Sequence, residues 1–217
     1  MRFAREGRAL ILGATGVALV VFLAAAAWRH WIGWTLAGIA GLTAGAVVYF
    51  FRDPERSGPR GPHLVVAPAD GRVVGIRALE EPTYVRGPAT RVAIFLSVLD
   101  VHVNRYPVSG VVEVKEYQRG GFALAWRDEA GTQNERATLG LAAPRGRVLV
   151  RQIAGRVARR IVTYPAVGAR VEQGERMGII KFGSRVETFV PAGAEVLVRE
   201  GDTVRGGVTV LARWEEV

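Results

Sequence analysis

Cysteine is absent from this chain of 217 residues. The protein therefore has no disulfides, no thiolate catalysis and no cysteine-ligated zinc or iron–sulfur site. Histidine is almost as scarce, since only His30, His63 and His102 occur, and the patterns H-E-x-x-H and H-x-H are missing. We therefore expect no metal site.

Lysine is also rare, because Lys115 and Lys181 are the only two. The formal net charge is nevertheless +9, so arginine carries almost all of the positive charge. A basic surface suits either nucleic acid or anionic lipid. No signature of a nucleic-acid-binding module occurs, so we expect an anionic phospholipid and the membrane as partners, and no nucleic acid.

Long stretches without charge are confined to the N-terminus. One covers residues 9–27 and a second covers residues 31–51. At about 1.5 Å per helical residue, each run spans roughly 28–32 Å, close to the hydrocarbon thickness of a bilayer. A cleaved signal peptide would leave a single run. We expect a two-helix transmembrane hairpin that anchors the chain. The alternative is a buried helical hairpin in a soluble protein.

Arginines lie before the first apolar run and after the second, whereas the turn between the runs carries only Arg29 and His30. By the positive-inside rule, both ends and the rest of the chain face the cytoplasm. We therefore expect a cell-membrane protein whose folded domain lies on the cytoplasmic face. The flanking arginines are Arg2, Arg5, Arg8, Arg52, Arg56 and Arg60.

After the anchor, the composition changes twice. Residues 52–63 are charged and rich in proline and glycine, which predicts a linker. Residues 64–217 alternate short runs rich in valine and isoleucine with glycine turns, which predicts a mainly β, barrel- or sandwich-like domain. A short helical turn is expected within 133–140. The predicted strands cover residues 64–67, 72–76, 91–95, 110–116, 147–153, 161–164, 177–182, 187–190, 195–199 and 208–214.

A faint internal repeat lies near the C-terminus. The pattern V-x-x-G-x-x-apolar occurs at residues 171–177 and again at 198–204. Each copy predicts a hairpin whose glycine, Gly174 or Gly201, takes a turn conformation that other residues disfavour. The spacing resembles lipoyl- and biotinyl-type barrels. Both lysines lack the M-K-M-like setting of those carriers, so we expect no swinging-arm carrier.

Four short motifs follow one another through the β domain. Taken singly, each has an ordinary structural explanation as a turn, a core strand or a polar loop. The motif around Ser184 is not the G-x-S-x-G elbow of serine hydrolases, because Val186 stands where the second glycine should be. A serine hydrolase therefore fits the sequence poorly. The motifs are Ala67-Pro68-Ala69-Asp70-Gly71, FLSVLDVHVNRYPVSG at 95–110, Asn134-Glu135-Arg136, and Phe182-Gly183-Ser184-Arg185.

This ordered set resembles the phosphatidylserine decarboxylases, in particular the short bacterial and archaeal branch with its FGSR-type cleavage site. The resemblance covers the whole β domain and implies a hammerhead-type fold with lipoyl-like hairpins. It implies a lyase of phospholipid biosynthesis made as a zymogen, which cleaves itself between Gly183 and Ser184 into a β chain (1–183) and an α chain (184–217). Ser184 then becomes a covalent pyruvoyl cofactor. This cofactor forms a Schiff base with phosphatidylserine, which loses carbon dioxide to give phosphatidylethanolamine.

The resemblance also implies roles for single residues. His102 is the expected general base of self-cleavage and general acid of decarboxylation. Asp70 is the first choice, and Asp100 the second, for the carboxylate that orients His102. The long branch has a second histidine where this chain has Arg105, so His102 would serve both steps or Arg105 would assist by binding the headgroup. The expected substrate-binding residues are Arg105, Asn134, Glu135 and Arg136.

Two other functions fit the sequence. One is a non-catalytic, membrane-tethered β-barrel adaptor, in which Gly183-Ser184 is only a hairpin. The other is a pyruvoyl decarboxylase that acts on a different amine. The oligomeric state stays open, and a homodimer is one option.

Overall fold

The computed structural model describes residues 2–121, 133–155, 160–181 and 184–215. The chain divides into two units, Met1–Glu55 and Arg56–Val217. The boundary between them falls within the segment that its proline and glycine content predicts to be a linker.

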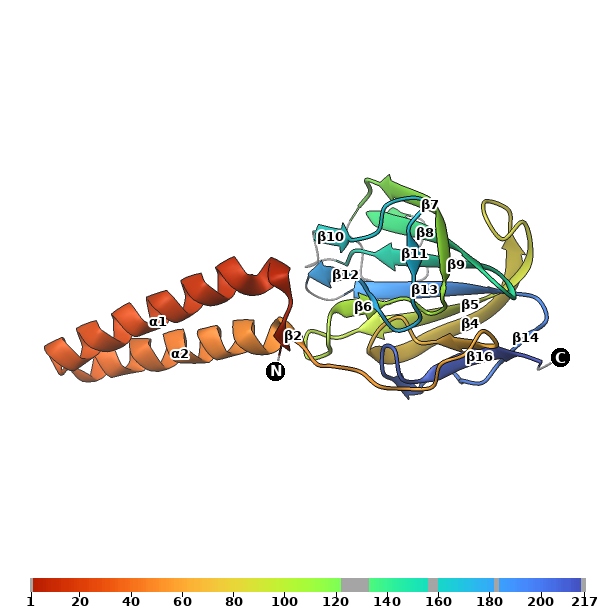
Figure 1. The fold of residues 1–217 in the computed structure, drawn as a ribbon. Coiled ribbons are helices and arrows are strands. Elements are labelled where there is room, and N and C mark those ends of the chain that lie inside the picture. The colour runs from red at the N-terminus through yellow and green to blue at the C-terminus, as the bar shows by residue number, and fades with distance from the viewer. Residues whose placement is uncertain (1, 122–132, 156–159, 182–183, 216–217) are drawn as a thin grey trace. The chain divides into compact units, whose positions relative to one another are not determined.

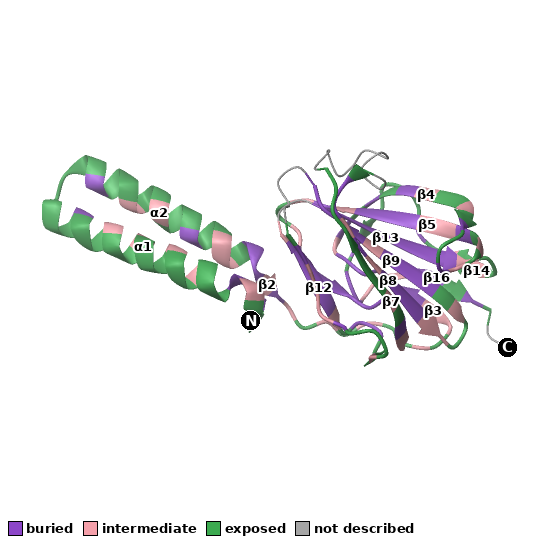
Figure 2. Ribbon diagram, turned by 90° about the horizontal axis from the view of Figure 1, so that it is seen from above, coloured by how far each residue is buried: buried purple, intermediate pink, exposed green. Residues whose placement is uncertain are grey.

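Two apolar helices make up most of the N-terminal unit (Figure 1). Helix α1 covers Arg8–Trp28 and helix α2 covers Trp31–Phe50. Arg29 ends α1 with a φ of 51°, and the His30 side chain accepts a hydrogen bond from the backbone N–H of Ile32 at the start of α2. Most of both helices is exposed (Figure 2), and by length and composition each is apolar enough to cross a membrane.

The polar groups inside these helices are satisfied locally. Each threonine hydroxyl donates to a backbone carbonyl four residues earlier: Thr15 to Ile11 (2.8 Å), Thr35 to Trp31 (3.1 Å) and Thr43 to Ile39 (2.9 Å). Such bonds suit a hydrocarbon environment, where no water satisfies a hydroxyl.

The segment before α1 pairs with the segment after α2. Strand β1 (Arg2–Phe3) is followed by a single 3-10 turn, η1 (Arg5–Gly7), and pairs antiparallel with β2 (Arg52–Asp53). A Cβ atom on Gly7 would lie 2.2 Å from the buried ring of Phe51, so glycine permits this close approach. Both ends of the predicted membrane hairpin therefore lie on one side of it.

Antiparallel sheets form the described part of the C-terminal unit (Figure 1). An eight-stranded sheet curls into a half-barrel in the order β11-β7-β8-β9-β13-β5-β4-β15, and three-stranded sheets have the orders β10-β12-β6 and β14-β16-β3. The strands are β3 (Leu64–Val66), β4 (Gly71–Glu81), β5 (Gly87–Leu96), β6 (Val103–Arg105), β7 (Gly110–Gln118), β8 (Arg136–Ala143), β9 (Gly146–Ile153), β10 (Arg160–Thr163), β11 (Arg170–Val171), β12 (Arg176–Lys181), β13 (Ser184–Pro191), β14 (Ala194–Val196), β15 (Thr203–Val204) and β16 (Val210–Trp214).

The prediction of a mainly β domain is confirmed. The prediction of a helical turn within 133–140 is wrong over most of its length, because β8 begins at Arg136 and pairs with both β7 and β9. Pairing on both edges overrides the weak local preference of this segment. Strand β6 was missed, since three residues are too few to show an alternating pattern.

The internal repeat forms two matching turns but no hairpins. Gly174 has a φ of 80° and Gly201 a φ of 94°, which confirms the predicted turn conformation. The backbone N–H of Glu175 donates to the Glu172 carbonyl (3.0 Å), and that of Asp202 donates to Arg199 (3.1 Å). These are the features of type II turns. The hairpin prediction is wrong, because β11 pairs with β7, β12 with β10 and β6, and β15 with β4.

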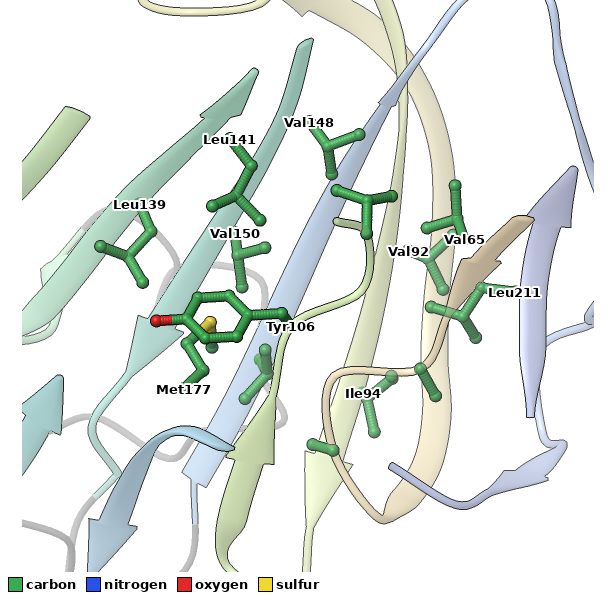
Figure 3. Close-up of a cluster of buried hydrophobic side chains, with 14 of the residues drawn as sticks. Val65, Val92, Ile94, Tyr106, Leu139, Leu141, Val148, Val150, Met177 and Leu211 are labelled. Carbon is green, nitrogen blue, oxygen red and sulfur yellow. The ribbon is translucent and has the colours of Figure 1, made fainter. Parts of the chain in front are cut away.

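The main core lies on the concave face of the half-barrel and includes residues from both small sheets (Figure 3). A second, smaller cluster, Tyr84, Ala89, Leu149 and Phe189, packs on the opposite face of the curled sheet. Because side chains alternate along a strand, β5, β9 and β13 each contribute to both clusters. The labelled core residues in Figure 3 are Val65, Val92, Ile94, Tyr106, Leu139, Leu141, Val148, Val150, Met177 and Leu211.

Candidate active site

Strand β13 begins at Ser184, and the chain arrives there from another sheet. The preceding strand β12 ends at Lys181 in a three-stranded sheet, whereas β13 lies between β9 and β5 in the half-barrel. The two strands therefore do not pair with each other, as they would in the simple hairpin of the adaptor alternative. Gly183, the predicted cleavage residue, lies outside the described residues.

The side chain of Ser184 points into the main core. Val186 and Val190 share its face of β13 and belong to that core, whereas Phe189 on the other face belongs to the second cluster. Ser184 is fully buried, and its Oγ has no hydrogen-bond partner within the described part of the chain. An unpaired buried hydroxyl costs about 1–3 kcal/mol, so its retention points to a use in chemistry.

Asn134 and Glu135 lie beside Ser184, at the end of strand β9. Arg185 pairs with Ile153, so Ala154 follows next to Ser184. The Asn134 side chain donates to the Ala154 carbonyl (2.7 Å), and the Ala154 backbone N–H donates to the Glu135 carbonyl (2.9 Å). The third motif and the cleavage motif, far apart in sequence, therefore meet in the fold.

His102 lies beside the last residues of β12. It is fully buried, and its backbone carbonyl accepts from the N–H of Ile180 (3.4 Å), two positions before the undescribed residues 182–183. Its ring Nδ1 is 2.9 Å from the backbone oxygen of Asp100. A carbonyl only accepts, so Nδ1 carries the proton in the neutral ring and Nε2 is the basic nitrogen.

The two carboxylates considered as partners of His102 make other hydrogen bonds. The Asp70 carboxylate accepts from Arg56 (2.6 Å) and from the Gly206 N–H (2.8 Å). Burial raises the pKa of Asp70, with the negative Asp100 nearby adding to the effect, while Gly206 and Arg56 oppose it. The Asp100 carboxylate accepts from the backbone N–H and the hydroxyl of Ser97 (2.8 and 2.7 Å). Orientation of His102 by the Asp70 carboxylate stays a prediction.

The two arginines that were predicted to bind substrate, Arg105 and Arg136, both donate hydrogen bonds to other residues of the protein. Arg105 is buried and donates to the Gly174 carbonyl (2.9 Å), which ties β6 to the first repeat turn. Arg136 donates to the Gln118 side chain (2.5 Å) on the neighbouring strand. A role for either in binding the headgroup stays a prediction.

Sequence reasoning missed a buried amide pair. The Gln152 side chain donates to the Asn104 oxygen (2.6 Å), and both residues are almost completely buried. Gln152 stands opposite Val186 on the core face, which makes it a diagonal neighbour of Ser184. A polar residue on the face of β9 that otherwise carries Val148 and Val150 was the available signal.

Arg185, next to Ser184, belongs to a buried charge cluster on the opposite face of the sheet. Its guanidinium lies 2.7 Å from the Glu187 carboxylate, which Arg91 and Arg151 approach at 3.5 and 3.6 Å. Burial lowers the pKa of Arg151, and Glu187 opposes that shift. This cluster fixes β13 between its neighbours.

The sequence matches the family model "Phosphatidylserine decarboxylase" over residues 44–212. It is 54% identical over 198 residues to the phosphatidylserine decarboxylase proenzyme of Symbiobacterium thermophilum, covering 90% of each chain. It is 52% identical over 170 residues to that of Salinibacter ruber (77% of this chain, 75% of the relative). It is 47% identical over 192 residues to that of Gluconacetobacter diazotrophicus (86% and 84%).

These relatives identify the class of protein as a carboxy-lyase. The chain belongs to the phosphatidylserine decarboxylase family.

Proposed function

We propose that this protein is a self-cleaving proenzyme that converts phosphatidylserine to phosphatidylethanolamine and carbon dioxide, using a pyruvoyl group made from Ser184. The observation that carries the proposal is the buried Ser184 Oγ without a described partner, at the first residue of β13. The names of the relatives, all decarboxylase proenzymes, support it.

Self-cleavage uses only residues of the chain. Ser184 Oγ attacks the Gly183 carbonyl carbon, so an ester C–O bond forms and the peptide C–N bond breaks, while a proton moves from Oγ to the freed nitrogen. Loss of the Cα proton of residue 184 then breaks its Cβ–O bond and releases the carboxylate of residue 183. The remaining dehydroalanine takes up water and loses ammonia, which leaves a pyruvoyl group.

We assign the proton transfers to His102. Its Nδ1 is held by the Asp100 backbone oxygen, which leaves Nε2 as the base for the Ser184 hydroxyl. Because Asp100 acts here through its main chain, its side chain is free to close the turn on Ser97. The same ring nitrogen, once protonated, supplies the proton that replaces carbon dioxide.

The surroundings of Ser184 fit the proposed cofactor. A pyruvoyl group supplies a ketone that captures a primary amine and withdraws electrons from the bond to the leaving carboxylate. The buried position of residue 184 keeps bulk water away from it. Asn134 and Glu135 are the best placed of the predicted substrate-binding residues, because both contact Ala154 beside it.

We further propose that α1 and α2 anchor the enzyme in the cell membrane with residues 64–217 on the cytoplasmic face and 52–63 as the linker. The exposed apolar surfaces of both helices and the arginines at their common end support this arrangement.

The variant Ser184→Ala tests the proposal. On a denaturing gel the wild type is expected as fragments of residues 1–183 and 184–217, the smaller with a blocked N-terminus, whereas Ser184→Ala stays a single chain and releases no carbon dioxide. His102→Ala is expected to slow cleavage, and Ser57→Ala, an exposed linker serine, serves as the matched control. An active wild-type chain that is continuous through this bond would contradict the proposal. Assays with free serine and other amines in place of phosphatidylserine test the remaining alternative.

A further inference from the structure

Two large apolar side chains stand exposed at the tip of the turn between β5 and β6. Val98 is 54% exposed and Leu99 is 69% exposed. Single exposed apolar residues are ordinary on protein surfaces. Within the described part of the C-terminal unit, however, these two are the only adjacent large hydrophobic residues that are both exposed. We call them the Val98–Leu99 tip.

Hydrogen bonds close the turn that carries the tip. The Asp100 backbone N–H donates to the Ser97 carbonyl (3.0 Å), and the Asp100 carboxylate accepts from both the N–H and the hydroxyl of Ser97. Leu96 and Val101, on either side of this closed turn, are buried. The tip therefore projects from a closed turn whose two flanking residues are held in the core.

The tip lies at the same end of the unit as the candidate active site. Leu96, the last residue of β5, pairs directly with Ser184, and His102 follows the turn on its other side. Strand β12 ends at this point too, and Figure 1 shows β12 and the start of β13 at one end of the domain. The apolar tip therefore lies at the end of the domain where β13 begins with the buried serine.

Positive charge accompanies the tip. Lys181 is the last residue of β12, and Arg160 on β10 is its pairing partner. Arg160 is exposed at this end of the sheet. An apolar projection with cations beside it is the combination that binds the interface of an anionic bilayer.

We propose that the Val98–Leu99 tip inserts into the interfacial region of an anionic lipid bilayer and turns the Ser184 end of the domain toward the membrane. The headgroup of a phosphatidylserine molecule then reaches the site while its acyl chains stay in the bilayer. Two side chains are far too small a patch for a stable protein–protein interface, so a lipid surface is the better match. The inference rests on the proposed function in taking a membrane lipid as substrate.

An optical test does not depend on activity. Because the chain has no cysteine, Leu99→Cys and Val167→Cys each offer a unique site for an environment-sensitive fluorophore. Val167 is similarly exposed at 60%, but it lies beyond Thr163, at the other end of β10 from Arg160. In full-length protein reconstituted into phosphatidylserine-containing vesicles, the label at residue 99 is expected to shift to the blue and to be quenched by nitroxide lipids, whereas the label at 167 is not. Equal quenching at both positions, or at neither, overturns the proposal.

A kinetic test uses the double variant Val98→Ser/Leu99→Ser, with Val167→Ser/Leu197→Ser as the matched exposed control. Carbon dioxide release from phosphatidylserine in vesicles is expected to fall about tenfold in the tip variant only. Release from short-chain phosphatidylserine dispersed as monomers is expected to be unchanged in both variants. A tip variant with an unchanged vesicle rate, or with the same loss on both substrates, overturns the proposal.

The two tests separate this inference from the proposed function. A wild-type protein that releases no carbon dioxide from either form of phosphatidylserine contradicts the proposed function, while quenching of the label at residue 99 still supports the tip. Normal catalysis without quenching at residue 99 supports the proposed function and overturns the tip.

Discussion

Two neighbouring residues of β13, Ser184 and Arg185, point to opposite faces of one sheet. The serine hydroxyl lies in an apolar core without a described partner, where burial suits a nucleophile that must act once on its own backbone. The arginine lies in a buried cluster in which three guanidinium groups form ion pairs with one carboxylate, that of Glu187. That cluster holds the strand, and hence the serine, in register.

At this scale we predict that Glu187→Gln lowers the free energy of unfolding by about 3 kcal/mol. The change leaves three guanidinium groups without their shared anion, and breaking a buried pair in this way is costly. Urea unfolding of the detergent-solubilised protein, followed by tryptophan fluorescence, measures the effect. The exposed pair Arg213–Glu195 supplies the control, because Glu195→Gln is expected to cost at most about 1 kcal/mol. Similar losses for the two variants would disprove the role given to the cluster.

Among the structural elements, the loop that joins β4 to β5 shows how one carboxylate organises a turn. Glu81 accepts from the backbone N–H groups of Thr83 (3.2 Å), Tyr84 (2.8 Å) and Val85 (2.8 Å), and from the Thr83 hydroxyl. Burial alone would raise the pKa of Glu81, but these donors outweigh it and hold the pKa below its ordinary value of 4.5. The ionised form is therefore the one that stabilises the fold.

The pH dependence of stability follows from that shift. A carboxyl with a lowered folded-state pKa contributes stability above its unfolded value, and this contribution is lost as the pH falls through the folded-state pKa. We expect Glu81→Gln to lower the free energy of unfolding by about 1–2 kcal/mol at pH 7, with the difference from wild type closing below pH 4.5. Denaturant titrations from pH 7 to pH 3 measure it, and the exposed neighbour variant Glu80→Gln is the control. A difference that widens in acid would refute the assignment.

On the scale of the whole molecule, the chain consists of two units whose surfaces differ in polarity. The N-terminal unit exposes large apolar side chains along both helices, whereas the C-terminal unit buries a continuous core on the inside of its half-barrel. All residues that we assign to self-cleavage belong to the second unit. The proposed transmembrane anchor and the proposed chemistry therefore belong to different units.

We predict that residues 56–217 alone fold and cleave themselves at the Gly183–Ser184 bond. Circular dichroism is expected to show a strand-rich spectrum, and a denaturing gel to show both fragments. Without α1 and α2, we expect weaker flotation with phosphatidylserine vesicles than for the full chain. Failure of this shortened chain to cleave, while remaining folded, would show that the N-terminal unit takes part in the chemistry.

The amino-acid sequence by itself determined the features that depend on neighbouring residues in the chain. Two runs of about 20 apolar residues are enough to predict two long helices, α1 and α2, because runs of that length match the thickness of a bilayer. Alternation of valine and isoleucine with polar residues located most of the strands, and Gly174 and Gly201 marked their turns. The four motifs were enough to recognise the family and to single out Ser184.

Only the tertiary structure decided which strands pair and which face of each strand is buried. Alternation shows that Ser184 and Arg185 face opposite ways, but the pairing of β13 with β5 and β9 decides that the serine meets the core. Likewise, the pairing of β6 with β12 brings His102 beside the end of β12. Such contacts join residues far apart in the chain, and no local pattern encodes them because their energy comes from long-range pairing and burial.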